Sequence, residues 1–281
     1  MYNIQQKKGG LSMINYRKDK ERYKVNDLGS LYVNSKKLSK NEQPIIYVGG
    51  QLSHHEHMLE LMGFSPDLNY NEYTGCWMYD YSIFSKNKNS INAENFSENL
   101  LLSLKEAKLN DVILVTFSHG GIIGAYASKS ELINKVISIH PAIIGTPLVN
   151  YEELKKYNDI FNSTQKIIAQ AIKYIIDFNY GYEQDNFNGA DLRKVDLNKV
   201  LVVGNALNPN LDKNKLLKET FKIIKMLTGF QSDGAIVFEP KEFDRLGINY
   251  MNTSESYNHT DAQNPDFVKK YVNKIINETR L

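Results

Sequence analysis

Short apolar runs alternate with amphipathic segments along most of the chain. Residues 44–48, 112–115, 136–139 and 200–203 are almost continuously apolar, which is typical of central parallel strands covered on both faces. Weak alternation over residues 28–33 predicts an early antiparallel hairpin, and residues 77–81 and 248–251 predict two further strands.

Helical patterns fill the intervals between these strands. Ser53 and Glu56 have the form of a capping box that opens a helix, which Gly63 would end. Helical spacing also predicts helices over residues 93–108 and 215–226, and a C-terminal helix from Pro265. This alternation predicts an α/β fold, with a mostly parallel central sheet flanked by helices.

Residues 150–196 interrupt the alternation and form a predicted insertion. Its amphipathic helix has an apolar face formed by Ile160, Ile167, Ile168, Ala171, Ile172, Ile175 and Ile176. Ligand sites in open α/β sheets lie beyond the carboxyl ends of the strands, so we expect a helical cap there; a helix that merely packs on the surface is the alternative. The predicted organisation is an N-terminal extension with an edge hairpin (1–43), a core (44–149 and 197–281) and the cap (150–196).

Composition excludes some classes of function. The 281 residues are 42% hydrophobic and 23% charged, with a net charge of +2. The lysines are scattered among acidic residues, so we expect no nucleic-acid partner. No apolar run is long enough to cross a membrane, and no apolar segment follows the early lysines as in a secretory signal. A cytoplasmic protein is therefore predicted, with the single cysteine, Cys76, as a small buried apolar residue.

The most informative motif is the segment Thr-Phe-Ser-His-Gly at residues 116–120. It follows the strand at 112–115 and precedes a run of small and apolar residues at 121–125. A strand, a tight turn and an immediate helix are the parts of a nucleophile elbow, which exposes a serine hydroxyl at a helix N-terminus. Ser118 is thus the candidate nucleophile; a turn serine that only caps the helix is the alternative.

A serine nucleophile needs a base and an acid, in the chain order serine, acid, histidine for this arrangement. Asp233 lies downstream of the strand at 200–203, and His259 follows the strand at 248–251. His259 would take the serine proton and Asp233 would orient the imidazole. Asp212 and Asp261 remain alternatives for the acid.

These motifs resemble the α/β-hydrolase fold family, and within it the lipase-like serine esterases. The resemblance rests on residues 116–121, 232–237 and 258–261 and covers the chain from residue 44 onward, without the insertion. It implies a Ser118–Asp233–His259 triad and an oxyanion hole made by the backbone N–H of His119 and of Gly50 or Gln51. Thr116 departs from the family, which usually has glycine or alanine there, and its β-branched side chain would crowd the turn.

The other histidines receive different assignments. His54, His55 and His57 suggest a metal site only weakly, because no further ligand motif lies nearby, and a solvated first helical turn explains them. The side chain of His119 is expected to line the cleft. His140 ends a buried strand and is expected to be a hydrogen-bonded core or rim residue. No metal or organic cofactor is predicted.

The sequence therefore predicts a serine hydrolase that cleaves acyl esters of small molecules or lipids through an acyl-enzyme intermediate. The isoleucines of the insertion favour an apolar acyl pocket, and the cap is where a membrane surface would be contacted. Two alternatives stay open: an acyltransferase or thioesterase with the same triad, and a hydrolase-fold binding protein that has lost catalysis.

Overall fold

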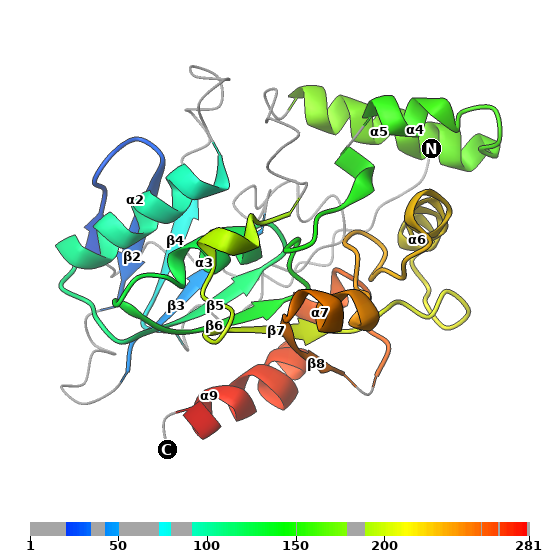
Figure 1. Cartoon of the computed structure of the whole chain (residues 1–281). Helices are drawn as coiled ribbons and strands as arrows, with labels where there is room; N and C mark the ends of the chain where they lie inside the picture. Colours follow the sequence, from blue (N-terminus) through cyan, green and yellow to red (C-terminus); the bar gives the residue numbers. More distant parts are fainter. Residues whose placement is uncertain are drawn as a thin grey trace, which may run out of the picture.

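An eight-stranded sheet forms the centre of the molecule (Figure 1). The computed structural model describes residues 21–34, 43–50, 73–79, 92–149, 151–178, 189–253, 255–263 and 265–279. The strands are β1 (Glu21–Tyr23), β2 (Gly29–Val33), β3 (Ile45–Val48), β4 (Gly75–Tyr79), β5 (Val112–Phe117), β6 (Ile133–Ile139), β7 (Val200–Gly204) and β8 (Asn249–Asn252).

The strand order is β1-β2-β4-β3-β5-β6-β7-β8. β2 runs antiparallel to both β1 and β4, while all pairs from β4 to β8 are parallel. The mostly parallel sheet and its antiparallel beginning are as predicted. β4 starts at Gly75, two residues earlier than the alternation indicated, because Gly75 and Cys76 pair with both β2 and β3. Cys76 is buried, as expected.

Helices cover both faces of the sheet (Figure 1). The helices are α2 (Ala93–Glu106), α3 (Gly120–Ala127), α4 (Tyr151–Lys156), α5 (Ser163–Phe178), α6 (Lys215–Thr228), α7 (Pro240–Leu246), α8 (Pro265–Phe267) and α9 (Asn273–Thr279), with 3-10 turns η3 (Pro147–Val149), η5 (Leu192–Lys194) and η6 (Asp261–Gln263) and a π-helical turn η7 (Val268–Val272). α2, α3 and α7 contribute to the apolar cluster on one face, and α8, η7 and α9 to the cluster on the other. No helix among the described residues is long and apolar enough to cross a membrane.

β5 illustrates why a continuous apolar run becomes a central strand. It pairs with β3 on one side and β6 on the other, and all six of its residues are buried. Alternate side chains enter opposite clusters: Leu114 lies in the cluster with α2 and α3, and Val115 in the cluster with α9. Both faces of the strand must therefore be apolar, and no polar alternation is visible in the sequence.

Helices α4 and α5, which lie between β6 and β7 in the chain, pack on α6. Helices α4 and α5 and the preceding turn share a separate apolar cluster with α6, formed by Leu148, Leu154, Phe161, Ile168, Ala169, Ile223, Ile224 and Val237; Figure 1 shows α4, α5 and α6 next to one another. Two residues that were predicted to lie on the apolar face of the helix are exposed instead. Ile160 precedes α5 and is 64% exposed, and Ile167 lies within α5 but is 66% exposed. The predicted helix at residues 53–62 lies outside the described residues.

Candidate active site

Ser118 stands between the end of β5 and the start of α3. Its φ of 53° places it in the left-handed region, which side chains other than glycine rarely adopt. Its backbone is held on both sides, because its N–H donates to Ile139 O (3.2 Å) and its carbonyl accepts from Gly121 N (3.0 Å) and Ala142 N (3.1 Å). Strained backbone held this firmly is a feature of functional sites. It is also the backbone expected of a nucleophile elbow.

Ser118 does not cap the helix that follows it. His119 is the N-cap residue of α3. The Ser118 hydroxyl instead faces His259, with 3.1 Å between Oγ and Nε2. The alternative, a serine that only caps the helix, therefore does not describe Ser118.

Thr116 fits the turn without the crowding that its β-branched side chain suggested. Its Oγ1 lies 2.5 Å from the Oγ of Ser138 on β6, so the buried hydroxyl is hydrogen-bonded. Its methyl group lies against Gly124 of α3, where a Cβ would come within 2.6 Å of Thr116 Cγ2. Gly124 thus supplies the space that the threonine takes.

The carboxylate of Asp233, in the loop at residues 232–237, contacts the imidazole of His259. The carboxylate is buried, and its Oδ2 lies 2.7 Å from His259 Nδ1. Its Oδ1 accepts from the backbone N–H groups of Ala235 (2.8 Å) and Ile236 (2.7 Å). Burial alone would raise the pKa of the Asp233 carboxyl, but the adjacent His259 and His140 outweigh it and hold the pKa below its usual range. The carboxylate is therefore ionised at neutral pH.

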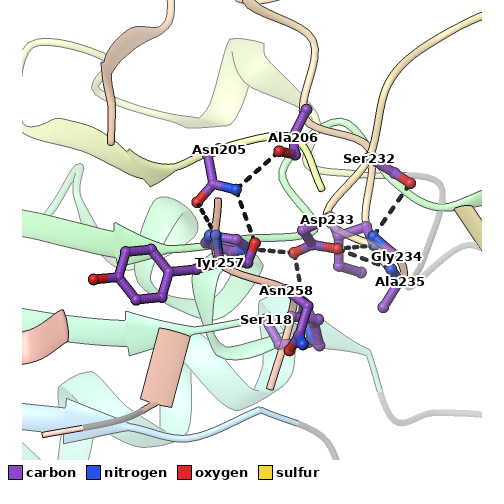
Figure 2. A network of polar contacts seen from close by, with 12 residues as sticks. Ser118, Asn205, Ala206, Ser232, Asp233, Gly234, Ala235, Tyr257 and Asn258 are labelled. Carbon is purple, nitrogen blue, oxygen red and sulfur yellow. Dashed lines mark hydrogen bonds and ion pairs between the residues drawn. The ribbon is translucent and has the colours of Figure 1, made fainter. Parts of the chain in front are cut away.

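The loop that carries His259 follows β8 and is tied to the end of β7. The side chain of Asn205, directly after β7, accepts from the Tyr257 backbone N–H (3.2 Å) and donates to the carbonyls of Tyr257 (2.8 Å) and Ala206 (2.9 Å). Figure 2 shows this network beside the Asp233 turn. The His259 backbone N–H also donates to the Asp233 carbonyl at 3.0 Å. Asp233 and His259 are thus held to each other by a backbone hydrogen bond as well as by the contact between their side chains.

The alternative acids occupy other positions. Asp212 Oδ2 accepts from the side chain of Asn258 at 2.8 Å, and its Oδ1 accepts from the Asn214 backbone. Asp261 is exposed and its backbone N–H donates to Asn258 Oδ1. In the described contacts, the imidazole of His259 meets the carboxylate of Asp233 and of neither alternative.

The predicted oxyanion-hole residues can be placed in part. Gly50 follows β3 and lies against the nucleophile, since a Cβ on it would come within 2.8 Å of Ser118 Cβ. His119 is at the N-terminus of α3. Its side chain was expected to line the cleft, but it is fully buried. Burial lowers the pKa of His119 to about 3, so the imidazole is neutral. Gln51 lies outside the described residues, as do His54, His55 and His57.

His140 is the residue whose role the sequence did not reveal. It was expected to be a hydrogen-bonded core or rim residue, and it lies in the core with Nδ1 2.5 Å from Asp233 Oδ2. It too has a positive φ, of 41°. The only available signal was its position after β6, the strand next to the one that leads to Ser118.

His140, Asp233 and His259 place nitrogen and oxygen atoms within 4.8 Å of one another, as metal ligands can. Their contacts have the lengths of hydrogen bonds. Two ligand atoms on a tetrahedral zinc ion, each at about 2.0 Å from it, would be roughly 3.3 Å apart. The N···O distances of 2.5 and 2.7 Å here are shorter, and the second nitrogen of His259 faces Ser118. The group fits a hydrogen-bonded cluster better than a metal centre.

Comparison with known proteins defines the fold. No family model matches the chain, and no curated protein matches it. Among solved structures, VinJ is 10% identical, with 94% of this chain and 98% of that chain covered and a TM-score of 0.50. An esterase, EaEST from Exiguobacterium antarcticum, is 13% identical over 92% and 99% of the two chains, with a TM-score of 0.49. The lipase BlEst2 from Bacillus licheniformis is 13% identical over 85% and 93%, with a TM-score of 0.47.

The strand order and the antiparallel second strand are those of the α/β-hydrolase fold, and the similarity to VinJ over most of both chains agrees with one shared fold. At 10% identity, the similarity to VinJ bears on the fold alone. The reaction has to be argued from the side chains at Ser118, Asp233 and His259.

Proposed function

We propose that this protein is a serine hydrolase that cleaves acyl esters through an acyl-enzyme intermediate. The observation that carries the proposal is one continuous chain of contacts, from Ser118 Oγ through His259 Nε2 and Nδ1 to Asp233 Oδ2, with distances of 3.1 and 2.7 Å. A hydroxyl, an imidazole and a buried carboxylate that contact one another in this order activate a serine as a nucleophile. The chain order serine, acid, histidine agrees with the fold.

The proposed reaction follows from the protonation states. Asp233, ionised, keeps the proton of His259 on Nδ1, so Nε2 has a lone pair toward the Ser118 hydroxyl. Ser118 attacks the ester carbonyl while His259 takes its proton, and His259 then returns the proton to the departing alcohol. In the second half of the reaction, His259 takes a proton from water, which attacks the carbonyl of the acyl-enzyme. His259 then returns the proton to Ser118 Oγ as the ester bond to Ser118 breaks, which releases the carboxylic acid.

The negative oxygen of the tetrahedral intermediate needs hydrogen-bond donors. We assign the backbone N–H groups of His119 and Gly50 to this oxyanion hole, with Gln51 as the alternative to Gly50. The assignment is supported by the N-terminal position of His119 on α3, where backbone N–H groups and the helix dipole favour negative charge, and by the close approach of Gly50 to Ser118.

The proposed substrates are small-molecule or lipid esters, with residues 150–196 as the cap over the acyl group. The described contacts join this segment to the loop that carries Asp233 (residues 232–237), since Val237 packs in the cluster with α4, α5 and α6. Just before the segment begins, Thr146 of the core donates from Oγ1 to the carbonyl of Ala235, 2.7 Å away. A cap attached there would lie close to Asp233.

Labelling with a fluorophosphonate probe tests the proposal, because the probe reacts with activated serines. The wild type should be labelled once, and Ser118→Ala and His259→Ala should not be labelled. Ser163→Ala, at an exposed serine in the first turn of α5, is the matched control and should be labelled like the wild type. A wild type that is not labelled and hydrolyses no aryl ester of any chain length would overturn the proposal.

The same preparation distinguishes the related activities. A chain-length series of aryl esters, measured beside the matching thioesters, compares the two acyl donors. Product analysis with an added alcohol compares water with another acyl acceptor. A thioester preference or predominant transfer would replace the esterase assignment while keeping the triad.

A further inference from the structure

His140 touches the candidate acid, yet the reaction proposed above does not use it. Its Nδ1 lies 2.5 Å from Asp233 Oδ2, and His259 Nδ1 lies 2.7 Å from the same oxygen. Two imidazoles from distant parts of the chain therefore share one carboxylate oxygen. Their ring centres are 6.2 Å apart.

This sharing saturates the carboxylate. Oδ1 already accepts the backbone N–H groups of Ala235 and Ile236. With both imidazoles on Oδ2, four donors surround a group that has about four acceptor sites. The Asp233 side chain cannot rotate without losing at least one of these bonds, so its orientation toward His259 is fixed from several directions.

The surroundings of His140 hold its ring in this position. Its backbone N–H donates to Val203 O at 3.0 Å, and its ring lies over Gly204, where a Cβ would come within 2.7 Å of His140 Cδ2. Phe267 and Phe238 pack near the ring, with centroids at 6.1 and 6.2 Å. The glycine at the end of β7 thus leaves space for the histidine at the end of β6.

The contacts of the ring also indicate where its proton is. His140 Nε2 is buried and has no hydrogen-bond partner among the described residues. A proton there would be a buried donor without an acceptor, which is costly. A proton on Nδ1 alone makes His140 a donor to Asp233 Oδ2.

We propose that His140 is a positioning residue, which donates its Nδ1–H to Asp233 Oδ2 and so both holds the carboxylate against His259 and limits its attraction for the His259 imidazolium. This inference rests on the proposed catalytic roles of Asp233 and His259. Without the His140 donor, Oδ2 would serve His259 alone. The imidazolium would gain stability, and the less firmly held carboxylate would orient the imidazole less well.

Two further acidic groups among the described residues bear on this pair. Asp261 interacts with His140, and Asp212 interacts in turn with Asp261. Burial raises the pKa of the Asp261 carboxyl, and the nearby Asp212 raises it further. Both acids remain in every variant below, so their influence is constant.

Two substitutions of His140 test the proposal. His140→Phe keeps a ring and removes the donor, whereas His140→Asn keeps an amide N–H near the position of Nδ1 and tolerates a positive φ. For ester hydrolysis, we expect His140→Phe to lower kcat about tenfold with little change in KM, and to move the acidic limb of the kcat/KM profile to higher pH. His140→Asn should restore most of kcat and return the limb toward the wild-type position.

A purely structural role would leave the acidic limb in place and make the variants differ only in stability. An unshifted limb in both folded variants, or an asparagine variant as impaired as the phenylalanine variant, would overturn the proposal.

Proton NMR of the imidazole N–H groups gives a readout that needs no turnover. The wild type should show two strongly downfield signals, and His140→Phe and His259→Ala should show one each. An active wild type with a single such signal overturns the shared carboxylate. An inactive wild type with two signals overturns the proposed function and leaves the sharing of Asp233 intact, so the two failures are distinguishable.

Discussion

Ser118 Oγ and His259 Nε2 lie 3.1 Å apart, although 141 residues separate them in the chain. The left-handed backbone of Ser118 lifts the hydroxyl from the end of β5, and the loop after β8 brings the imidazole to it. Each residue is held by contacts of its own, so the approach is a property of the folded core.

Replacing Ser118 should separate activity from stability. Ser118→Ala should lower ester hydrolysis by about 10⁴-fold or more, because the nucleophile is gone. Ser118→Gly should be equally inactive, but its free energy of unfolding should exceed that of the alanine variant by about 1 kcal/mol, since glycine adopts a φ of 53° without strain. Urea denaturation of both variants measures this. Equal stabilities would contradict the strain.

Asp233 and Asp212 offer a direct comparison of candidate acids. Asp233→Asn should lower kcat about 10⁴-fold, because an amide at this position favours the wrong imidazole tautomer. Asp212→Asn should retain activity within about threefold, since Asp212 contacts Asn258 and Asn214 rather than the imidazole. Steady-state kinetics on an aryl ester decides between them; the reverse ranking would make Asp212 the acid.

Thr116 and Gly124 should be coupled energetically. Gly124→Ala introduces a Cβ at 2.6 Å from Thr116 Cγ2 and 3.0 Å from Val136 Cγ1, and should destabilise the fold by about 2 kcal/mol. Thr116→Ser removes the methyl group and keeps the hydroxyl that meets Ser138. The double variant should therefore be more stable than the sum of the single effects predicts, in a double-mutant cycle from chemical denaturation. Simple additivity would argue against the contact.

The buried His119 should make stability depend on pH. Its pKa is about 3 in the folded protein, against 6.5 as its ordinary value, so between these two values the unfolded chain binds a proton that the folded chain does not. Stability then rises with pH in this interval, and is lost as the pH falls from about 6.5 toward 3, by up to about 1.4 kcal/mol per pH unit.

His119→Gln lacks this titration. Its free energy of unfolding, measured in urea at several pH values between 7 and 4, should fall less steeply than that of the wild type. The slope is compared rather than the absolute stability, because the substitution also changes packing. Identical slopes would show that the imidazole titrates equally in both states.

Asn205 should support the histidine loop. Asn205→Ala removes two donors and an acceptor that hold Tyr257 and Ala206, and should lower the free energy of unfolding by about 3 kcal/mol. Thr253→Ala, which removes one bond to the same amide, is the milder matched change. Thermal unfolding of both, together with kcat, tests whether the loop positions His259; an Asn205 variant with wild-type kcat and stability would show that it does not.

Much of this arrangement was predictable from the sequence because it depends on local pattern. Continuous apolar runs predicted the central strands, since a strand covered on both faces cannot alternate. The small residues after Ser118 and the later Asp233 and His259 predicted the candidate site, because the fold requires that order along the chain. The antiparallel beginning of the sheet followed from the alternation near β2.

Other features were decided by tertiary packing alone. Helical periodicity placed Ile167 on the apolar face, yet it is exposed, because the pattern does not specify which side α6 will cover. The accommodation of Thr116 by Gly124 required two elements to meet. His140 reaches the carboxylate of Asp233, 93 residues away, because β6 pairs with β7 and because Leu207, shortly after β7, donates its backbone N–H to the carbonyl of Ser232 next to Asp233. A sequence pattern indicates which residues are suited to burial, and the packing of the elements decides which of them are buried and which of them meet.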